Sequence, residues 1–164
     1  MAGHPDQGGQ RAVAVVVDGE RVLLMKRYLH KPDPGLCIMC RTLGTAVPGP
    51  AGPRCPGHHY AVLPGGHVED GEPIEEAVVR ELIEETSLVG RIDRVLWTGR
   101  HNEREATYFL MADVTGTPTL GGPELAKNNP DNSFELVWAT ADELDGLGLH
   151  PADAREPLAK LLAG

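Results

Sequence analysis

The feature that most constrains the fold is the stretch IEEAVVRELIEET at residues 74–86. Its apolar residues recur at helical spacing, and the preceding proline and early carboxylates favour a helix start. At about 100° per residue, the apolar positions define an inward-facing arc that contains Ala77, Val78 and Leu82. Glu81 and Glu85 fall inside this arc, and Glu84 lies on its edge. Carboxylates on the inward side of a helix need a cation or hydrogen-bond donors to compensate them.

Two explanations fit this glutamate cluster. The first is a charge-dense helix end whose carboxylates are solvated, because such helices are common. The second is a site at which hard oxygen ligands hold Mg²⁺ or Mn²⁺. The neighbouring sequence favours the second explanation.

From Gly66 the chain reads GHVEDGEPIEEAVVRELIEETSL. This stretch resembles the Nudix box, G-x5-E-x7-R-E-U-x-E-E-x-G-U, in which U is an aliphatic residue. Every specified position matches except Ser87, where the family usually has a glycine that ends the helix in a left-handed conformation. The preceding LPGG also looks like the family's entry from strand to loop.

The resemblance implies a fold, a reaction and a set of site residues. The fold is of the α/β class, a Nudix-type α/β/α sandwich with a mixed central sheet over residues 11–164. The reaction is hydrolysis of a nucleoside diphosphate linked to another moiety, by water attack on phosphorus, with Mg²⁺ or Mn²⁺ as cofactor. The metal ligands would be Glu81, Glu84 and Glu85, one of which could act as the base. The Gly66 carbonyl would lie near the metal, and Glu72 would pair with Arg80 to fix the loop to the helix.

A further carboxylate from a later loop completes the metal site in many members of that family. Glu124, in the sequence GGPEL, is the candidate here. The alternative is that Glu124 is a solvated loop residue.

The remaining sequence predicts strands and helices that interleave, which favours a mixed sheet with helices on both faces. Residues 11–17 and 21–27 are strands joined by an Asp-Gly turn. Further strands are expected at 60–66, 91–100, 106–114 and 134–139, a polar loop at 115–132, and helices at 141–146 and 151–162. Residues 1–10 are expected to be a mobile tail.

Residues 28–59 form an insertion rich in proline and glycine, and this insertion contains all three cysteines of the chain. The spacing C-x2-C-x14-C-x2-H predicts a structural Zn²⁺ site with the ligands Cys37, Cys40, Cys55 and His58. A metal would offset the closure entropy of so long a loop. His59 could replace His58, and His30 is a weaker alternative. A flexible loop with ordinary thiols and a redox-active CIMC pair are the competing explanations.

Aromatic residues that could stack on a base are few, and most are expected in the core: Trp97, Tyr108, Phe109, Phe134 and Trp138. Four residues between two predicted strands could contact phosphates or form a solvated hairpin turn: Arg100, His101, Asn102 and Arg104. Because motifs of the hydrolases specific for ADP-ribose and for dinucleoside polyphosphates do not match at the expected spacing, a (d)NTP or related, oxidised or unmodified nucleotide is favoured as substrate.

The formal charge of −9 and the lack of a Lys/Arg-rich run argue against a nucleic-acid partner. No apolar run suggests a membrane span or a signal peptide, and an odd number of cysteines suits a reducing compartment, so a cytoplasmic enzyme is expected. Its partner would be a small-molecule nucleotide, and a homodimer is allowed. The alternative function is a Nudix-fold sensor that binds a nucleotide without hydrolysing it and uses the zinc loop to contact a partner protein.

Overall fold

The computed structural model describes residues 9–164. It contains two sheets, and strand β1 is an inner strand of the first. This sheet has the strand order β5-β1-β7-β6, with β1 parallel to β7 and the other pairs antiparallel. Its strands are β1 (Arg11–Val15), β5 (Gly65–His67), β6 (Val89–His101) and β7 (Arg104–Thr115). The predicted mixed sheet is therefore confirmed.

The second sheet is antiparallel and is built around β3. Its strands are β2 (Val17–Asp18), β3 (Arg21–Leu29), β4 (His58–Val62) and β8 (Asn132–Thr140). Asp18 pairs with Arg21, so the predicted Asp-Gly turn does join two strands. Gly19 adopts a φ of 62° there, a conformation that glycine reaches without steric cost.

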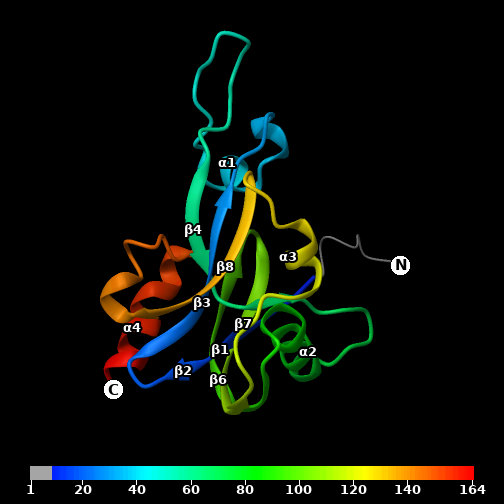
Figure 1. Ribbon diagram of the computed structural model, residues 1–164, viewed down its shortest axis with the longest axis vertical. Helices are drawn as coiled ribbons and strands as arrows, with labels where there is room; N and C mark the ends of the chain where they lie inside the picture. Colours follow the sequence, from blue (N-terminus) through cyan, green and yellow to red (C-terminus); the bar gives the residue numbers. More distant parts are fainter. Residues whose placement is uncertain (1–8) are drawn as a thin grey trace.

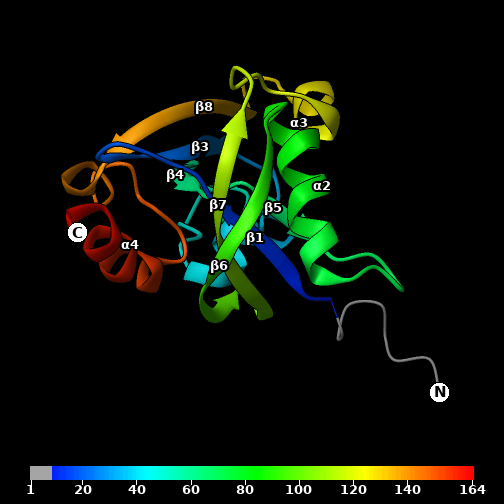
Figure 2. The ribbon, with the colours of Figure 1, turned by 90° about the horizontal axis from the view of Figure 1, so that it is seen from below.

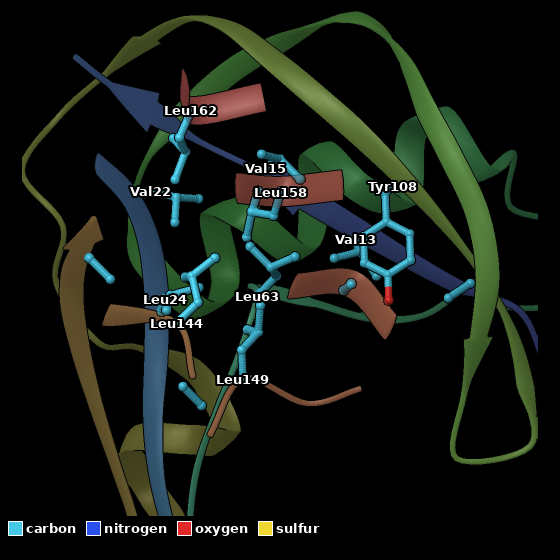
Figure 3. Close-up of a cluster of buried hydrophobic side chains, with 14 residues drawn as sticks. Val13, Val15, Val22, Leu24, Leu63, Tyr108, Leu144, Leu149, Leu158 and Leu162 are labelled. Carbon is cyan, nitrogen blue, oxygen red and sulfur yellow. The ribbon is translucent and has the colours of Figure 1, made fainter. Parts of the chain in front are cut away.

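Two helices cover the sheets from opposite sides, α2 (Ile74–Thr86) and α4 (Arg155–Ala163), as Figure 2 shows. Alternate residues of β1 face two different cores, because successive side chains of a strand point to opposite faces. Val13 and Val15 join the core that α4 closes with Leu158 and Leu162 (Figure 3). The alanines of β1 join the core beneath α2, which includes Val78 and Leu82.

Several short elements differ from the sequence-based expectation. The loop predicted at 115–132 contains α3 (Gly122–Lys127), and the helix predicted at 141–146 is a 3-10 turn at Ala141–Glu143. The last helix begins as a 3-10 turn at Ala152–Ala154 before α4. Pro73 caps α2 instead of occupying its first turn. Each difference concerns an element end or a helix of about one to two turns, where local propensity is weak.

The cysteine-containing insertion connects β3 to β4 and includes η1 (Pro34–Leu36) and α1 (Ile38–Leu43). Leu29 and His58 are paired across the two strands, so the insertion starts and ends at adjacent points. In Figure 1 the chain after α1 extends away from the sheets as a long loop and then returns to β4. Its bounds are narrower than the predicted 28–59, because β3 continues to Leu29 and β4 begins at His58.

Most of the predicted N-terminal tail lies outside the described residues. Gln10, at its end, accepts a hydrogen bond from the backbone N–H of Val68 at 2.9 Å. Among the described helices, none combines the length and apolar character needed to cross a membrane.

Candidate active site and cysteine cluster

Arg80 joins the loop before α2 to the glutamates on the helix. Its guanidinium donates two hydrogen bonds to Glu72, from Nε to Oε2 at 2.7 Å and from Nη2 to Oε1 at 2.9 Å. Hydrogen bonding from Arg80 lowers the pKa of Glu72 to about 2. A bidentate pair of this kind fixes orientation as well as charge. The structure therefore places Glu72 and Arg80 in the ion pair that the resemblance implies.

The same guanidinium contacts two further carboxylates. Nη1 of Arg80 lies 3.0 Å from Oε1 of Glu81 and 3.1 Å from Oε2 of Glu84, while Nη2 donates to the backbone carbonyl of His67 at 3.1 Å. Glu81 is largely shielded and Glu84 is about half exposed, with side-chain exposures of 13% and 43%. One arginine thus orients three glutamates, Glu72 in the loop before α2 and Glu81 and Glu84 in the C-terminal half of the helix.

Glu85 is the most buried glutamate of the cluster, with 6% of its surface exposed. Its Oε2 accepts a hydrogen bond from the backbone N–H of Gly65 at 3.0 Å. Burial raises the pKa of Glu85 well above its usual value, and the negative charge of Glu124 raises it further. Burial also raises the pKa of Glu81. Burial is the main cause of both shifts, so keeping these two carboxylates ionised is costly.

Gly66 lies directly against the carboxylate of Glu81. A Cβ atom at position 66 would lie within 2.5 Å of the Glu81 carboxylate carbon and oxygens, closer than real contacts allow. Only glycine lets β5 approach α2 this closely. The structure accounts in this way for the glycine that opens the box.

Glu124 lies on α3, which follows a loop held against the end of α2. The backbone N–H of Gly121 donates to the carbonyl of Glu85 at 3.2 Å. Oε2 of Glu124 is shielded from solvent and has no hydrogen-bond partner among the described residues. Its charge acts on both Glu85 and Glu81. Glu124 therefore lies near the glutamate cluster, as a later-loop ligand would.

The glutamate cluster has the chemistry of a site for a hard divalent cation, although its oxygens are not yet gathered closely enough to hold an ion. It offers carboxylate oxygens, the ligands that Mg²⁺ and Mn²⁺ prefer. One of them, Oε2 of Glu124, is shielded and has no hydrogen-bond partner within residues 9–164. The carboxylates are spread around the Arg80 guanidinium, because its Nη1 lies between Glu81 and Glu84. Five carboxylates, those of Glu72, Glu81, Glu84, Glu85 and Glu124, lie near three arginines, Arg11, Arg27 and Arg80, so a cation would complete the charge balance.

Ser87, the position that departs from the box, adopts the left-handed conformation that the family's glycine would have. Its φ is 64°, and its backbone N–H donates to the carbonyl of Ile83 at 2.9 Å. Its hydroxyl donates to the carbonyl of Thr119 at 3.0 Å. The serine therefore keeps the turn geometry and adds one hydrogen bond to the loop that carries Glu124.

The cysteine insertion closes around a buried Cys3His cluster. The ligand atoms of Cys37, Cys40, Cys55 and His58 all lie within 4.8 Å of one another. The Sγ atoms of Cys37 and Cys55 are 3.8 Å apart, and Sγ of Cys40 is 3.2 Å from Nε2 of His58. Tetrahedral Zn²⁺ with Zn–S bonds of about 2.3 Å separates its sulfur ligands by about 3.8 Å. The cluster geometry therefore fits Zn²⁺.

His58, and not His59, completes this cluster. Burial lowers the pKa of His58, which favours the neutral imidazole that binds metals. His59 points elsewhere and its ring lies 4.6 Å from that of Tyr28, while His30 lies near Asp131. Among the described Cys, His, Asp and Glu residues, these four are the group whose ligand atoms lie close enough together to hold a metal ion.

The predicted substrate-side residues separate into core and surface. Tyr108 and Phe109 are buried in the two cores, Trp97 stacks on Tyr108, and Trp138 packs against the core beneath α2. The guanidinium of Arg27 lies over the Phe134 ring, with its Cζ atom 3.9 Å from the ring centroid. Asn102 forms the tip of the β6–β7 turn, which lines a cavity with Arg100, His101 and Arg104.

Sequence reasoning missed two arginines near the cluster. Arg11 starts β1 and Arg27 lies in β3, and both interact electrostatically with Glu85. Burial lowers the pKa of each guanidinium. A lysine or arginine at the edge of an apolar strand is common, so only the pairing of β1 with β5 reveals that Arg11 lies beside the box.

Two curated proteins are similar to parts of this chain. An ADP-ribose pyrophosphatase from Methanocaldococcus jannaschii is 40% identical over 60 residues, which cover 37% of this chain and 36% of that protein. An RNA pyrophosphohydrolase from Erythrobacter litoralis is 32% identical over 104 residues, which cover 52% of this chain and 62% of that protein. Each match spans less than two thirds of the relative's length.

Solved structures extend the likeness over nearly the whole chain. The MutT NUDIX hydrolase from Burkholderia pseudomallei has a TM-score of 0.60 at 25% identity, covering 93% of this chain and 96% of that one. The E. coli ORF135 protein has a TM-score of 0.58 at 18% identity, with coverages of 99% and 94%, and shows the fold alone. The NUDIX domain model matches residues 8–163, and the chain therefore belongs to the NUDIX family.

Proposed function

We propose that this protein is a divalent-metal-dependent pyrophosphohydrolase that cleaves a nucleoside diphosphate linked to another moiety. The nucleotide that we favour is a (d)NTP or a related nucleotide. The observation that carries the proposal is geometric: Glu81 is largely shielded, Glu85 is buried, and Oε2 of Glu124 has no hydrogen-bond partner among the described residues. A surface with only a solvated role would not shield these oxygens from water.

The residues of the chain hold this group in a fixed arrangement. Arg80 orients Glu72, Glu81 and Glu84, and the Gly65 N–H holds Glu85. When bound, Mg²⁺ would supply neutralisation of the diphosphate and activation of water, with Glu81, Glu84, Glu85 and Glu124 as its protein ligands. Because burial raises the pKa of Glu85 in the metal-free protein, its ionised carboxylate is costly, and a bound cation would relieve that cost.

Incubation with a panel of nucleotides, dinucleotides and nucleotide sugars plus Mg²⁺, with products identified by mass, tests the proposal. We expect Glu85→Gln to lower turnover at least about 100-fold, in the range seen when one group that stabilises a transition state is removed. Glu75→Gln is the matched control, because Glu75 lies on the same helix and is exposed. Wild-type turnover in Glu85→Gln would contradict the assignment, and no hydrolysis across the panel would favour a nucleotide sensor.

We also propose that the Cys3His cluster binds a structural Zn²⁺. The donor set and the sulfur spacing support this, and the insertion has only a small core of its own, built around the cysteines and Tyr60. Elemental analysis of the purified protein should give about one zinc per chain. His58→Asn should lose it and His59→Asn should keep it; equal zinc contents in the two variants would exclude His58 as the ligand.

A further inference from the structure

A cavity of about 670 Å³ lies between the cysteine insertion and the turn that connects β6 to β7. Four arginines line it: Arg11, Arg41, Arg100 and Arg104. They come from three separate parts of the fold, since Arg11 starts β1, Arg41 lies on α1 and the other two flank the turn. Its volume is that of a typical small-molecule site.

The charge around this cavity is unusual for so acidic a chain. The whole sequence has a formal charge of −9, yet Glu103 is the one carboxylate residue among the described residues that line the cavity. Arg100 donates a hydrogen bond to the backbone carbonyl of Glu103. Guanidinium groups that face one space repel each other, and a bound anion would offset this repulsion.

Arg11 offers a hydrogen-bond donor that no described residue uses. Its Nε atom is shielded from solvent and has no hydrogen-bond partner among the described residues. A buried guanidinium N–H without an acceptor is costly. An incoming oxyanion would supply that acceptor.

The cavity adjoins the candidate active site. Arg11 pairs with His67 across β1 and β5, and His67 directly follows Gly66 of the box. The backbone carbonyl of His67 accepts a hydrogen bond from Arg80, and Arg11 interacts electrostatically with Glu85 and Glu81. A molecule bound at the glutamates can therefore extend into the cavity.

The insertion forms one wall of the cavity through Ile38 and Arg41 on α1. Cys37 caps the start of this helix and Cys40 lies within it, so the Cys3His cluster fixes the position of Arg41. Thr42, also on α1, approaches Asn102 at the tip of the β6–β7 turn at 3.5 Å, and Asn102 bonds His150 at 2.8 Å. The Cys3His cluster therefore holds the α1 wall, and the contact of Asn102 with His150 holds the wall formed by the β6–β7 turn.

We propose that this cavity binds a phosphate group of the substrate other than the diphosphate that is cleaved, and that the cysteine insertion supplies Arg41 for this purpose. That the bound phosphate belongs to a substrate rests on the proposed function. That the cavity binds an anion rests on the arginines alone. Guanidinium forks match phosphate oxygens in pairs, and four of them favour a phosphate over a singly charged carboxylate. The favoured substrates are nucleotides with a phosphate beyond the cleaved bond, such as triphosphates.

The test is calorimetry with inorganic tripolyphosphate and pyrophosphate as probes, on the zinc-containing protein without added Mg²⁺. We expect wild type to bind tripolyphosphate more tightly than pyrophosphate, and Arg41→Gln to weaken tripolyphosphate binding about tenfold. Arg54→Gln is the control, because Arg54 belongs to the same insertion and does not line the cavity. It should change binding less than twofold.

No tripolyphosphate binding by wild type, or equal losses in Arg41→Gln and Arg54→Gln, would overturn the proposal. Turnover separates this result from the proposed function: with a hydrolysed triphosphate and Mg²⁺, Arg41→Gln should raise KM and leave kcat unchanged. If no nucleotide is hydrolysed while Arg41 still governs tripolyphosphate binding, the hydrolase assignment fails and the anion site stands.

Discussion

Glu85 carries a stability cost that the metal would remove. Its folded-state pKa is raised above the usual value, so its ionised form, present at higher pH, destabilises the metal-free fold. In magnesium-free buffer at pH 7 we expect Glu85→Gln to be more stable than wild type, because the amide carries no charge and its oxygen can still accept the Gly65 N–H. Urea unfolding measures this difference, with Glu75→Gln expected to match wild type. A less stable Glu85→Gln would mean that its charge is already compensated.

The left-handed backbone of Ser87 destabilises the fold, and the hydrogen bond of its hydroxyl offsets part of that cost. The conformation costs a non-glycine residue about 1–2 kcal/mol, whereas a hydrogen bond such as that to Thr119 contributes about 0.5–1.5 kcal/mol. Ser87→Gly should therefore be slightly more stable than wild type. Ser87→Ala, which keeps the backbone cost and loses the bond, should be less stable by about 1 kcal/mol. Thermal unfolding should give the order Gly, Ser, Ala; any order with Ala above Ser would contradict this account.

At the level of elements, the β6–β7 hairpin should make the fold sensitive to acid through His101. Burial lowers the pKa of His101 to about 3, and the charges of Arg11, His150 and His67 act in the same direction. Because the folded pKa lies below the unfolded value, stability is complete above about pH 6.5 and falls as the pH drops toward 3.

Between pH 7.5 and pH 5, this one histidine should cost the fold about 2 kcal/mol. The raised pKa values of Glu81 and Glu85 act in the opposite sense, so the comparison must be made with a variant. We expect His101→Gln to lose about 2 kcal/mol less than wild type over this range. Chemical denaturation at the two pH values measures it, and parallel pH dependences would show that His101 is already solvated when folded.

Elements with a strong period or a fixed spacing could be predicted from the sequence. The arc of α2 placed Glu85 inward, and the cysteine spacing led to the observed Cys3His cluster. The six-residue helices α1 and α3 could not be predicted, because helices this short are unstable alone and form here within tertiary structure. Neither could the arginine cavity, since its residues meet only after β1, α1 and the β6–β7 turn are assembled.

Glu124 could be named as a candidate from the sequence, but its position in the fold could not be predicted. Its candidacy came from the resemblance, since nothing in GGPEL distinguishes it from a solvated loop residue. Its position near Glu85 depends on the hydrogen bonds of Thr119 and Gly121 to carbonyls at the end of α2. Contacts between segments more than thirty residues apart decide such a placement, and local sequence does not encode them.

For the whole molecule, the core on the α4 side of β1 should affect stability without affecting the candidate active site, which lies on the α2 side. Leu158 of α4 is fully buried in the core opposite α2 (Figure 3). Leu158→Ala should cost about 2–5 kcal/mol, and a chain of this size should lose about 2–4 °C in Tm for each kcal/mol. At 25 °C, kcat/KM should stay near wild type. Lys160→Ala on the exposed side of α4 is the control, and a large loss of turnover in folded Leu158→Ala would show that the cores are coupled.

The pairing of Leu29 with His58 has a consequence for how such a chain could have acquired its insertion. Two neighbouring residues of an antiparallel pair can be joined by a tight turn or by a much longer segment, and the strands on either side keep the same register. An ancestral β3–β4 hairpin could thus gain or lose the whole segment in one step. Substrate choice could then change by exchange of one loop, while the glutamate helix and both cores remain as they were.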